Sequence, residues 1–581
     1  MERLVTFVTY GLGRDRQSTI QEFRDALSHF SRDHVIYLCS AINAILRCWE
    51  RGAPELESHA HFLRKYFQPA EAERLIEASQ NSSQYVFHRQ QLLFVAKEAV
   101  LHCQEDGGAD PLIQPPGPVG MLFLMANDQL NSEVQTGDYE RTLSNALLEF
   151  IVTGEYSGHH AFRNGMARAY LMHSRFSDEL SADPDFINIG ELFGTLVGMS
   201  MEEFQSLCFA LLWKYENVSV QSYAENVRSL FIQQSYFSQT AVPTANLDKF
   251  KEELSATPDD FKNKFAPGLK GKNDFTLFRS KPLCLVGGHL FCIDVGLLAE
   301  KLESGPFWRV HSSLPTGKRD ALHRFWGKLF ERYMNWMLAE SIGAKNRTNT
   351  LYPNPKYQDG TEVCDAIILC DSAAVFVEYK GATFSARAKY SGDAALLRNE
   401  VERNLVENEV GRPKGIGQLA EAIRRTCQRR APEAIDGIDL SSVRSIYPLL
   451  ITRDAVGDAY ILNEMLRRKF NSIATLSRKM IGPRRLTPPC CMAAQTIEQI
   501  APYLADLSLS DIIDGRYRGR KYLGGSFFAV PNPVLQPLGV RENHVLEAAF
   551  KEFAEPMLKS LFPKEYEEQR LKGNRESPFK A

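Results

Sequence analysis

The sequence has no run of apolar residues long enough to cross a membrane, since a spanning helix needs about 20 consecutive, mostly apolar residues. The first sixteen residues also lack the continuous apolar core and the small-residue cleavage site of a secretory signal. We therefore expect no contact with a membrane and a cytoplasmic location.

A large net charge is missing as well. The 68 Lys and Arg residues nearly balance the 71 Asp and Glu residues, which leaves a formal net charge of -3. Total charge therefore does not indicate nucleic-acid binding, and any binding face must be local. The eleven cysteines are scattered without the spacing of a disulfide framework, which is typical of a reducing, intracellular setting.

No stretch completes a phosphate-binding loop. Around Thr316–Lys318, Ser312 takes the place of the first glycine and Arg319 that of the final Ser or Thr. This departure argues against an NTPase site.

The most informative stretch lies between residues 362 and 381. Its apolar, β-branched and aromatic residues predict two strands, at Ala366–Cys370 and Ala374–Tyr379, joined by a tight turn at Asp371-Ser372. Three ionisable residues interrupt this apolar hairpin, namely Asp365, Glu378 and Lys380.

Alternation of side chains along a strand places Glu378 and Lys380 on one face. An antiparallel partner that carries Asp365 would bring all three residues to one point. Two carboxylates there suit a hard cation such as Mg²⁺. The alternative is a structural salt bridge at the end of a strand, with Lys380 reaching solvent.

The spacing Asp, twelve residues, Glu-x-Lys resembles the signature of the PD-(D/E)XK nuclease superfamily, whose fold is restriction-endonuclease-like. The resemblance implies that Asp365 and Glu378 bind Mg²⁺, with Mn²⁺ as a substitute, and that the carbonyl of Tyr379 is a further ligand. It also implies that Lys380 supports the attacking water. Cys364 departs from the pattern, because it stands where the family has a proline.

Upstream, apolar residues at four-residue spacing predict a helix at 321–338. Its Gly-x-x-Phe-Glu stretch is similar to the first helix of several nucleases of this superfamily, whose glutamate points at the metal. Glu331 is the candidate here, and Gly327 one turn earlier permits close approach of a neighbouring segment. The alternative is an exposed glutamate paired with Lys328.

Downstream, Gly415–Arg425 resembles the helix that follows the core strands of the family, in which Gln418 would face the site. The RecB-like branch has a tyrosine four residues later, and Ala422 stands there instead. Tyr447–Thr452 is expected to form a further buried strand.

Basic residues gather after these elements. Candidate phosphate-binding residues are Arg424, Arg425, Arg467, Arg468, Lys469, Arg478 and Lys479. Between positions 464 and 485 the sequence sets seven basic residues against the single acidic residue Glu464. The alternative is a solvated helix whose basic residues pair elsewhere.

These patterns predict an α/β protein in four parts. Residues 1–240 form a mostly α-helical region, and 241–309 a connector with a β-hairpin that turns at Gly287-Gly288. Residues 310–530 form the nuclease-like domain, with a mixed sheet flanked by helices, and 531–581 a C-terminal helical extension.

The first functional hypothesis is a metal-dependent endonuclease that hydrolyses phosphodiester bonds, with DNA as the expected partner. The helical N-terminal region would then sense, recruit a partner protein or form a homo-oligomer, an arrangement that resembles prokaryotic defence nucleases. The alternatives are an RNA-cleaving nuclease, and a non-catalytic nucleic-acid-binding or scaffold protein that keeps the fold.

Overall fold

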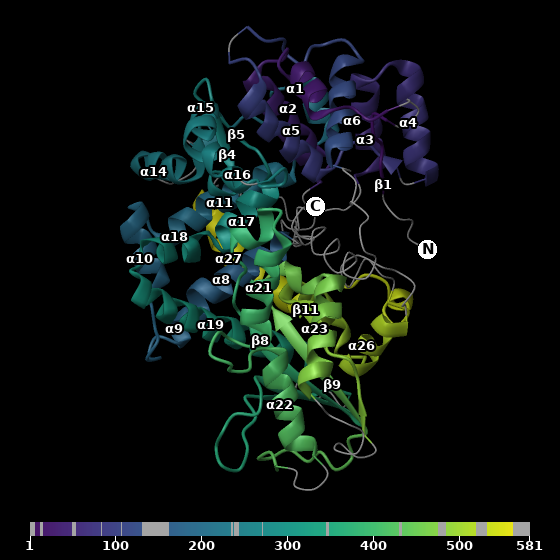
Figure 1. The fold of residues 1–581 in the computed structure, drawn as a ribbon. Coiled ribbons are helices and arrows are strands. Elements are labelled where there is room, and N and C mark those ends of the chain that lie inside the picture. The colour runs from purple at the N-terminus through teal and green to yellow at the C-terminus, as the bar shows by residue number, and fades with distance from the viewer. Residues whose placement is uncertain are drawn as a thin grey trace, which may run out of the picture.

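Helices dominate the protein, and strands concentrate in its C-terminal half. The computed structural model describes residues 6–11, 16–48, 54–82, 84–105, 107–130, 162–233, 236–237, 243–269, 271–343, 348–428, 433–474, 484–518 and 532–561. Figure 1 shows helices α1–α6 at the opposite end of the molecule from the strands β8 and β9.

The N-terminal half is helical, as the sequence predicted. Its helices are α1 (Ile20–Leu27), α2 (Arg32–Ile45), α3 (Leu56–Tyr66), α4 (Pro69–Ser82), α5 (Arg89–His102), α6 (Pro118–Leu130), α8 (Phe162–Tyr170), α9 (Phe176–Glu179), α10 (Ile189–Val197), α11 (Met201–Glu216), α12 (Val220–Glu225), α14 (Thr244–Leu254), α15 (Pro258–Asp260) and α16 (Thr276–Ser280). The two short strands β1 (Thr6–Phe7) and β2 (Gln84–Tyr85) pair in parallel. Capping boxes begin α1, with Thr19 and Glu22, and α11, with Ser200 and Glu203.

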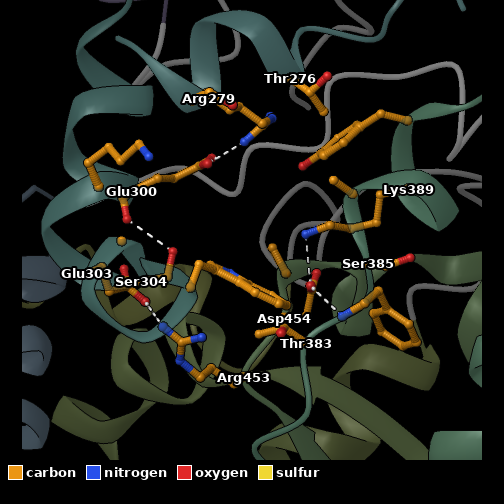
Figure 2. A pocket seen from close by; sticks show the side chains of 18 of the residues that line it. Thr276, Arg279, Glu300, Glu303, Ser304, Thr383, Ser385, Lys389, Arg453 and Asp454 are labelled. Carbon is orange, nitrogen blue, oxygen red and sulfur yellow. Dashed lines mark hydrogen bonds and ion pairs between the residues drawn. The ribbon is translucent and has the colours of Figure 1, made fainter. Parts of the chain in front are cut away.

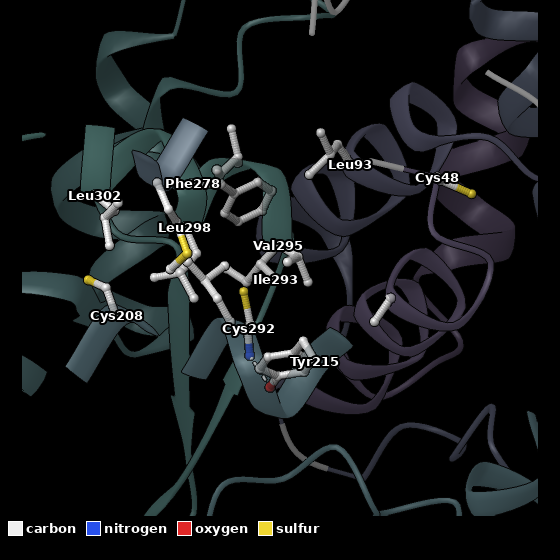
Figure 3. Packing of buried hydrophobic residues seen from close by; sticks show 14 of the residues in the cluster. Cys48, Leu93, Cys208, Tyr215, Phe278, Cys292, Ile293, Val295, Leu298 and Leu302 are labelled. Carbon is white, nitrogen blue, oxygen red and sulfur yellow. Dashed lines mark hydrogen bonds between the residues drawn. The ribbon is translucent and has the colours of Figure 1, made fainter. Parts of the chain in front are cut away.

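The predicted hairpin forms from β4 (Leu283–Val286) and β5 (His289–Cys292), and β3 (Ser255–Ala256) pairs with β4 in parallel. Both glycines of its turn have positive φ angles, 54° and 80°, which residues other than glycine rarely adopt. Figure 3 shows how β5 enters the main core, where the backbone N–H of Cys292 donates to the Tyr215 hydroxyl of α11 at 2.8 Å.

A buried ion pair fixes the start of α17 (Val295–Glu303). The carboxylate of Asp294 caps this helix by accepting the N–H of Leu297 at 2.8 Å. It also accepts two hydrogen bonds from the Arg89 guanidinium, at 2.7 and 2.8 Å, and one from Asn43. The side chains of Arg89 and Asp294 are 5% and 0% exposed, so a desolvated ion pair connects α5 with the start of α17.

A long helix and a mixed sheet follow α18 (Gly305–Ser313). The helix predicted at 321–338 is α19 (Thr316–Ile342). The strands are β6 (Thr350–Pro353), β7 (Ala366–Cys370), β8 (Ala373–Lys380), β9 (Ser445–Thr452), β10 (Arg485–Leu486) and β11 (Cys490–Ala493). Strands β6, β7 and β8 form an antiparallel meander, β9 lies parallel to β8, and β10 and β11 both pair with β9 in parallel.

Alternation along the strands gives the sheet two buried faces. Ile367, Phe376 and Leu450 belong to one apolar cluster with α21 (Ala394–Leu405), α22 (Ile416–Cys427) and α23 (Tyr460–Ala474). The opposite face, which includes Val377 and Tyr379, belongs to a second cluster with α19. This second cluster continues without a break into the N-terminal helices, so one core crosses the expected boundaries near residues 240 and 310.

The remaining described helices are α20 (Ala386–Tyr390), α25 (Ala494–Ile500), α26 (Leu509–Arg518) and α27 (His544–Leu561). Helix α27 packs against α8, where the rings of Phe553 and Tyr170 lie 5.6 Å apart. Within the described ranges, no helix has the length and apolar character needed to span a membrane.

Candidate active site

Strand register brings the two carboxylates of the predicted signature together. Ala366 of β7 pairs with Val377 of the antiparallel strand β8. Asp365, which precedes Ala366, therefore lies across from Glu378, which follows Val377. The carboxylate of Asp365 accepts the backbone N–H of Tyr379 at 2.5 Å. In a strand, the N–H and C=O of one residue point to the same neighbour. The Tyr379 carbonyl therefore points to the side on which Asp365 stands.

Glu378 and Lys380 share one face of β8, as alternation predicted. The Lys380 ammonium lies 2.6 Å from the Glu378 carboxylate. Glu378 is 2% exposed and Lys380 17%, so the ammonium is held at the border between the interior and solvent. This contact orients Lys380 at the end of the strand.

Close approach of α19 to the end of β8 positions Glu331. A Cβ atom on Gly381 would lie 3.1 Å from Gly327 Cα and 3.1 Å from Phe330 Cβ, so only a glycine fits comfortably. Gly327 thus permits the contact that the sequence predicted for it. Lys328 pairs with Asp183 and Asp185 rather than with Glu331.

Two further residues join the site without having been predicted. The side chain of Glu362 forms a hydrogen bond with that of Asp365. The side chain of Asn354 bonds to Glu331, and its backbone N–H donates to the Asp365 carbonyl at 2.9 Å. Asn354 has φ of 48°, a left-handed conformation that asparagine tolerates better than most residues.

The electrostatics of the site show an excess of negative charge. Burial, followed by repulsion from Asp365 and Glu362, raises the pKa of Glu331 to about 7. Burial raises the pKa of Glu378 to about 8. Attraction to Lys380 lowers this pKa in part, and repulsion from Asp365 raises it further. Burial also raises the pKa of Asp365, and burial together with repulsion from Asp365 raises that of Glu362. Four carboxyl groups and one ammonium thus influence one another's ionisation, and a bound cation would relieve the repulsion among the carboxyl groups.

The donor set fits a hard divalent cation bound in part through water. Asp365, Glu378 and the Tyr379 carbonyl supply oxygen ligands, and Mg²⁺ usually keeps several waters. Among the described residues, no three His, Cys, Asp or Glu side chains form a group that would hold a metal by themselves. The candidate ligand set consists of two carboxylates and a carbonyl, so solvent would complete the coordination.

Gln418 has a local role in the structure. Its side-chain oxygen accepts the backbone N–H of Gly415 at 3.0 Å and so caps its own helix, α22. The oxygen atom is thereby directed to the helix N-terminus. Gly415 has φ of 45°, which sets the entry of the chain into this helix.

The basic candidates that the structure describes are paired with acidic side chains. The pairs are Arg424–Glu421, Arg425–Glu433, Arg467–Glu464, Arg468–Glu464 and Lys469–Glu402, with distances between 2.5 and 3.2 Å. The sequence set only Glu464 against the basic residues of α23, and the fold adds Glu402 from α21. Arg478 and Lys479 lie outside the described residues. We refer to Arg467, Arg468 and Lys469 as the α23 basic run.

Comparison of the chain with protein-family models, with curated proteins and with solved structures found no match.

Proposed function

We propose that the protein is a metal-dependent nuclease of the PD-(D/E)XK type, which hydrolyses phosphodiester bonds and has DNA as its expected substrate. The observation that supports the proposal is the strand register that sets Asp365 across from Glu378, with Lys380 held beside Glu378 at the end of β8. The order of the elements supports it too, because α19, the β6–β8 meander, α22 and the parallel strand β9 follow the order expected from the resemblance.

The residues of the site suit attack of water on a phosphodiester. A bound Mg²⁺ or Mn²⁺ would neutralise charge on the phosphate and lower the pKa of a bound water. Lys380, oriented by Glu378, would donate a hydrogen bond to the attacking water or to a phosphate oxygen. With a pKa of about 7, Glu331 suits transfer of the water's proton near neutral pH. A new P–O bond then forms, the ester P–O bond breaks, and the leaving oxygen takes a proton from solvent.

The basic residues of α22 and α23 supply the proposed contacts to the nucleic-acid backbone. Because each described member already pairs with a glutamate, phosphates would have to compete with those carboxylates. Such exchange of one ionic partner for another makes binding sensitive to salt.

Cleavage assays test the proposal directly. Purified protein is incubated with plasmid, linear and single-stranded DNA and with RNA, in Mg²⁺, in Mn²⁺ and in EDTA. We expect metal-dependent cleavage of DNA, and a loss of about 10²- to 10⁴-fold for Lys380→Ala in a protein that remains folded by circular dichroism. Lys318→Ala, an exposed lysine at the start of α19, is the control and should cut like the wild type.

The outcomes separate the hypotheses. Cleavage confined to RNA would show that the substrate is RNA and not DNA. Retention of nucleic-acid binding without cleavage of any substrate, in either metal, would favour the non-catalytic binding protein. Undiminished cleavage by Lys380→Ala would exclude the role assigned to this lysine.

A further inference from the structure

A cavity of about 370 Å³ lies where the N-terminal half meets the ends of β8 and β9. Its walls come from α16, α17 and the start of α18 on one side, and from residues 383–386 and 453–455 on the other. Its volume falls near the lower end of the range typical of small-molecule sites. The position is characteristic too, because ligands of α/β proteins commonly bind beyond the carboxyl ends of parallel strands.

Positive charge exceeds negative charge on the cavity walls. Five basic residues, Arg168, Arg279, Lys301, Lys389 and Arg453, oppose three acidic residues, Glu300, Glu303 and Asp454. Figure 2 shows three of the ion pairs around the cavity, Arg279–Glu300, Arg453–Glu303 and Lys389–Asp454. Glu303 serves two guanidinium groups, since it also pairs with Arg168 at 2.9 Å. Arg168 pairs in addition with the buried Glu498, which does not line the cavity, so the wall residues themselves comprise five cationic groups and three carboxylates.

Two of these cationic groups are compensated only in part. The Arg453 side chain is 4% exposed, and its Nε has no hydrogen-bond partner in the described part of the protein. Burial also lowers the pKa of Arg453, because Glu303 compensates its charge only in part. The Lys301 side chain lines the same cavity and makes no hydrogen bond and no ion pair within the described part of the protein, although Glu253 and Glu300 attract it from a greater distance. A buried donor without a partner and an unpaired ammonium together favour an anionic ligand.

Aromatic rings share the cavity with these cations. Tyr390 lies beneath the Arg279 guanidinium, 4.3 Å from its ring centroid, and Trp308 and Phe384 also line the walls. Planar ligand groups stack well on aromatic and guanidinium surfaces. The combination suits a ligand with one planar apolar part and one strongly anionic part.

We propose that this cavity binds a nucleotide of mononucleotide size, with its phosphate near Lys301 and Arg453 and its base among the aromatic residues. The inference does not depend on the proposed nuclease activity. The cavity nevertheless adjoins the candidate active site, because the backbone N–H of Arg453 donates to the carbonyl of Lys380 at 3.0 Å. A ligand held by Arg453 would therefore lie next to residues 383–386, which follow Lys380 in the chain and line the same cavity.

Calorimetric titration of the full chain in EDTA tests the proposal, with AMP, GMP, CMP and UMP as probes and with adenosine and inorganic phosphate for comparison. We expect at least one nucleotide to bind, and adenosine and phosphate each to bind at least ten-fold more weakly. Lys301→Met should weaken nucleotide binding at least ten-fold, and Lys301→Arg should largely retain it. Lys214→Met is the matched control, because Lys214 is also half-buried with its pKa lowered by burial but lies outside the cavity.

Melting temperatures of all variants are measured in parallel, so that loss of folding is distinguished from loss of binding. Asp365→Asn should bind the nucleotide like the wild type, which separates this site from the candidate metal site. Absence of binding by all four nucleotides would overturn the proposal. Equal affinity for inorganic phosphate, or unchanged affinity in a folded Lys301→Met variant, would overturn it as well.

Discussion

Replacement of Glu378 by glutamine should make the metal-free protein more stable at high pH. Folding raises the pKa of this carboxyl from 4.5 to about 8, mainly through burial. Below about pH 4.5 the group is protonated in both the folded and the unfolded state, so the pKa difference has no effect on stability. As the pH rises toward 8, the unfolded chain releases its proton more readily than the folded protein, and the folded protein loses stability.

The size of this effect follows from linkage. The full difference between 4.5 and about 8, at about 1.36 kcal/mol per pH unit, corresponds to about 5 kcal/mol. Most of this amount, on the order of 3–4 kcal/mol, is lost between pH 5 and pH 8, since both ends of the interval fall near a pKa. Glu378→Gln keeps the volume and an acceptor for Lys380 but has no proton to release. Its advantage over the wild type should therefore grow by about this amount across the interval.

Urea unfolding in EDTA at several pH values measures the difference. Glu340→Gln on an exposed position of α19 is the control and should follow the wild type. Mn²⁺ at pH 8 should raise the stability of the wild type, because it binds the folded state, and should raise that of Glu378→Gln much less. A wild type and a Glu378→Gln variant that lose stability in parallel from pH 5 to pH 8 would refute the reasoning.

Three further predictions concern other parts of the protein. Charge reversal of the α23 basic run should weaken nucleic-acid binding and reduce its log–log salt slope by up to about three, measured by fluorescence anisotropy; an unchanged slope would show a solvated face only. Gly381→Ala should destabilise the protein by about 1–3 kcal/mol and slow cleavage, because the added methyl group displaces α19. Gly317→Ala, in the exposed first turn of α19 with open space around the added methyl group, should leave cleavage unchanged. Arg89→Leu should cost about 3–5 kcal/mol in unfolding assays, since it leaves the buried carboxylate at the start of α17 unpaired; a loss below about 1 kcal/mol would contradict this account.

The sequence predicted the local elements around the candidate site well. Strand β7 has the predicted bounds, and β8 exceeds its predicted range by one residue at each end. Asp371 in the turn between them has φ of 48°, as a tight turn with aspartate allows. Such features depend on neighbours along the chain, and alternation then fixed which residues share a face.

Contacts between distant segments could not be predicted in the same way. Glu362 and Asn354 enter the site through the path of the β6–β7 connection, and no spacing rule relates them to Glu331. Likewise, the pairing of Lys469 with Glu402 depends on how α21 and α23 lie on the sheet. The cavity has the same origin, because its two walls come from segments at least 75 residues apart in the sequence.

The packing of α27 on α8 has a consequence for synthesis of the chain. Tyr170 at the end of α8 leaves the ribosome 374 residues before His544 at the start of α27. At a translation rate of about 5–20 residues per second, α27 is synthesised about 20–75 s after α8. During that interval the nascent N-terminal half exposes the part of α8 that α27 covers in the folded protein. We therefore expect the growing chain to depend on chaperones until translation is nearly complete.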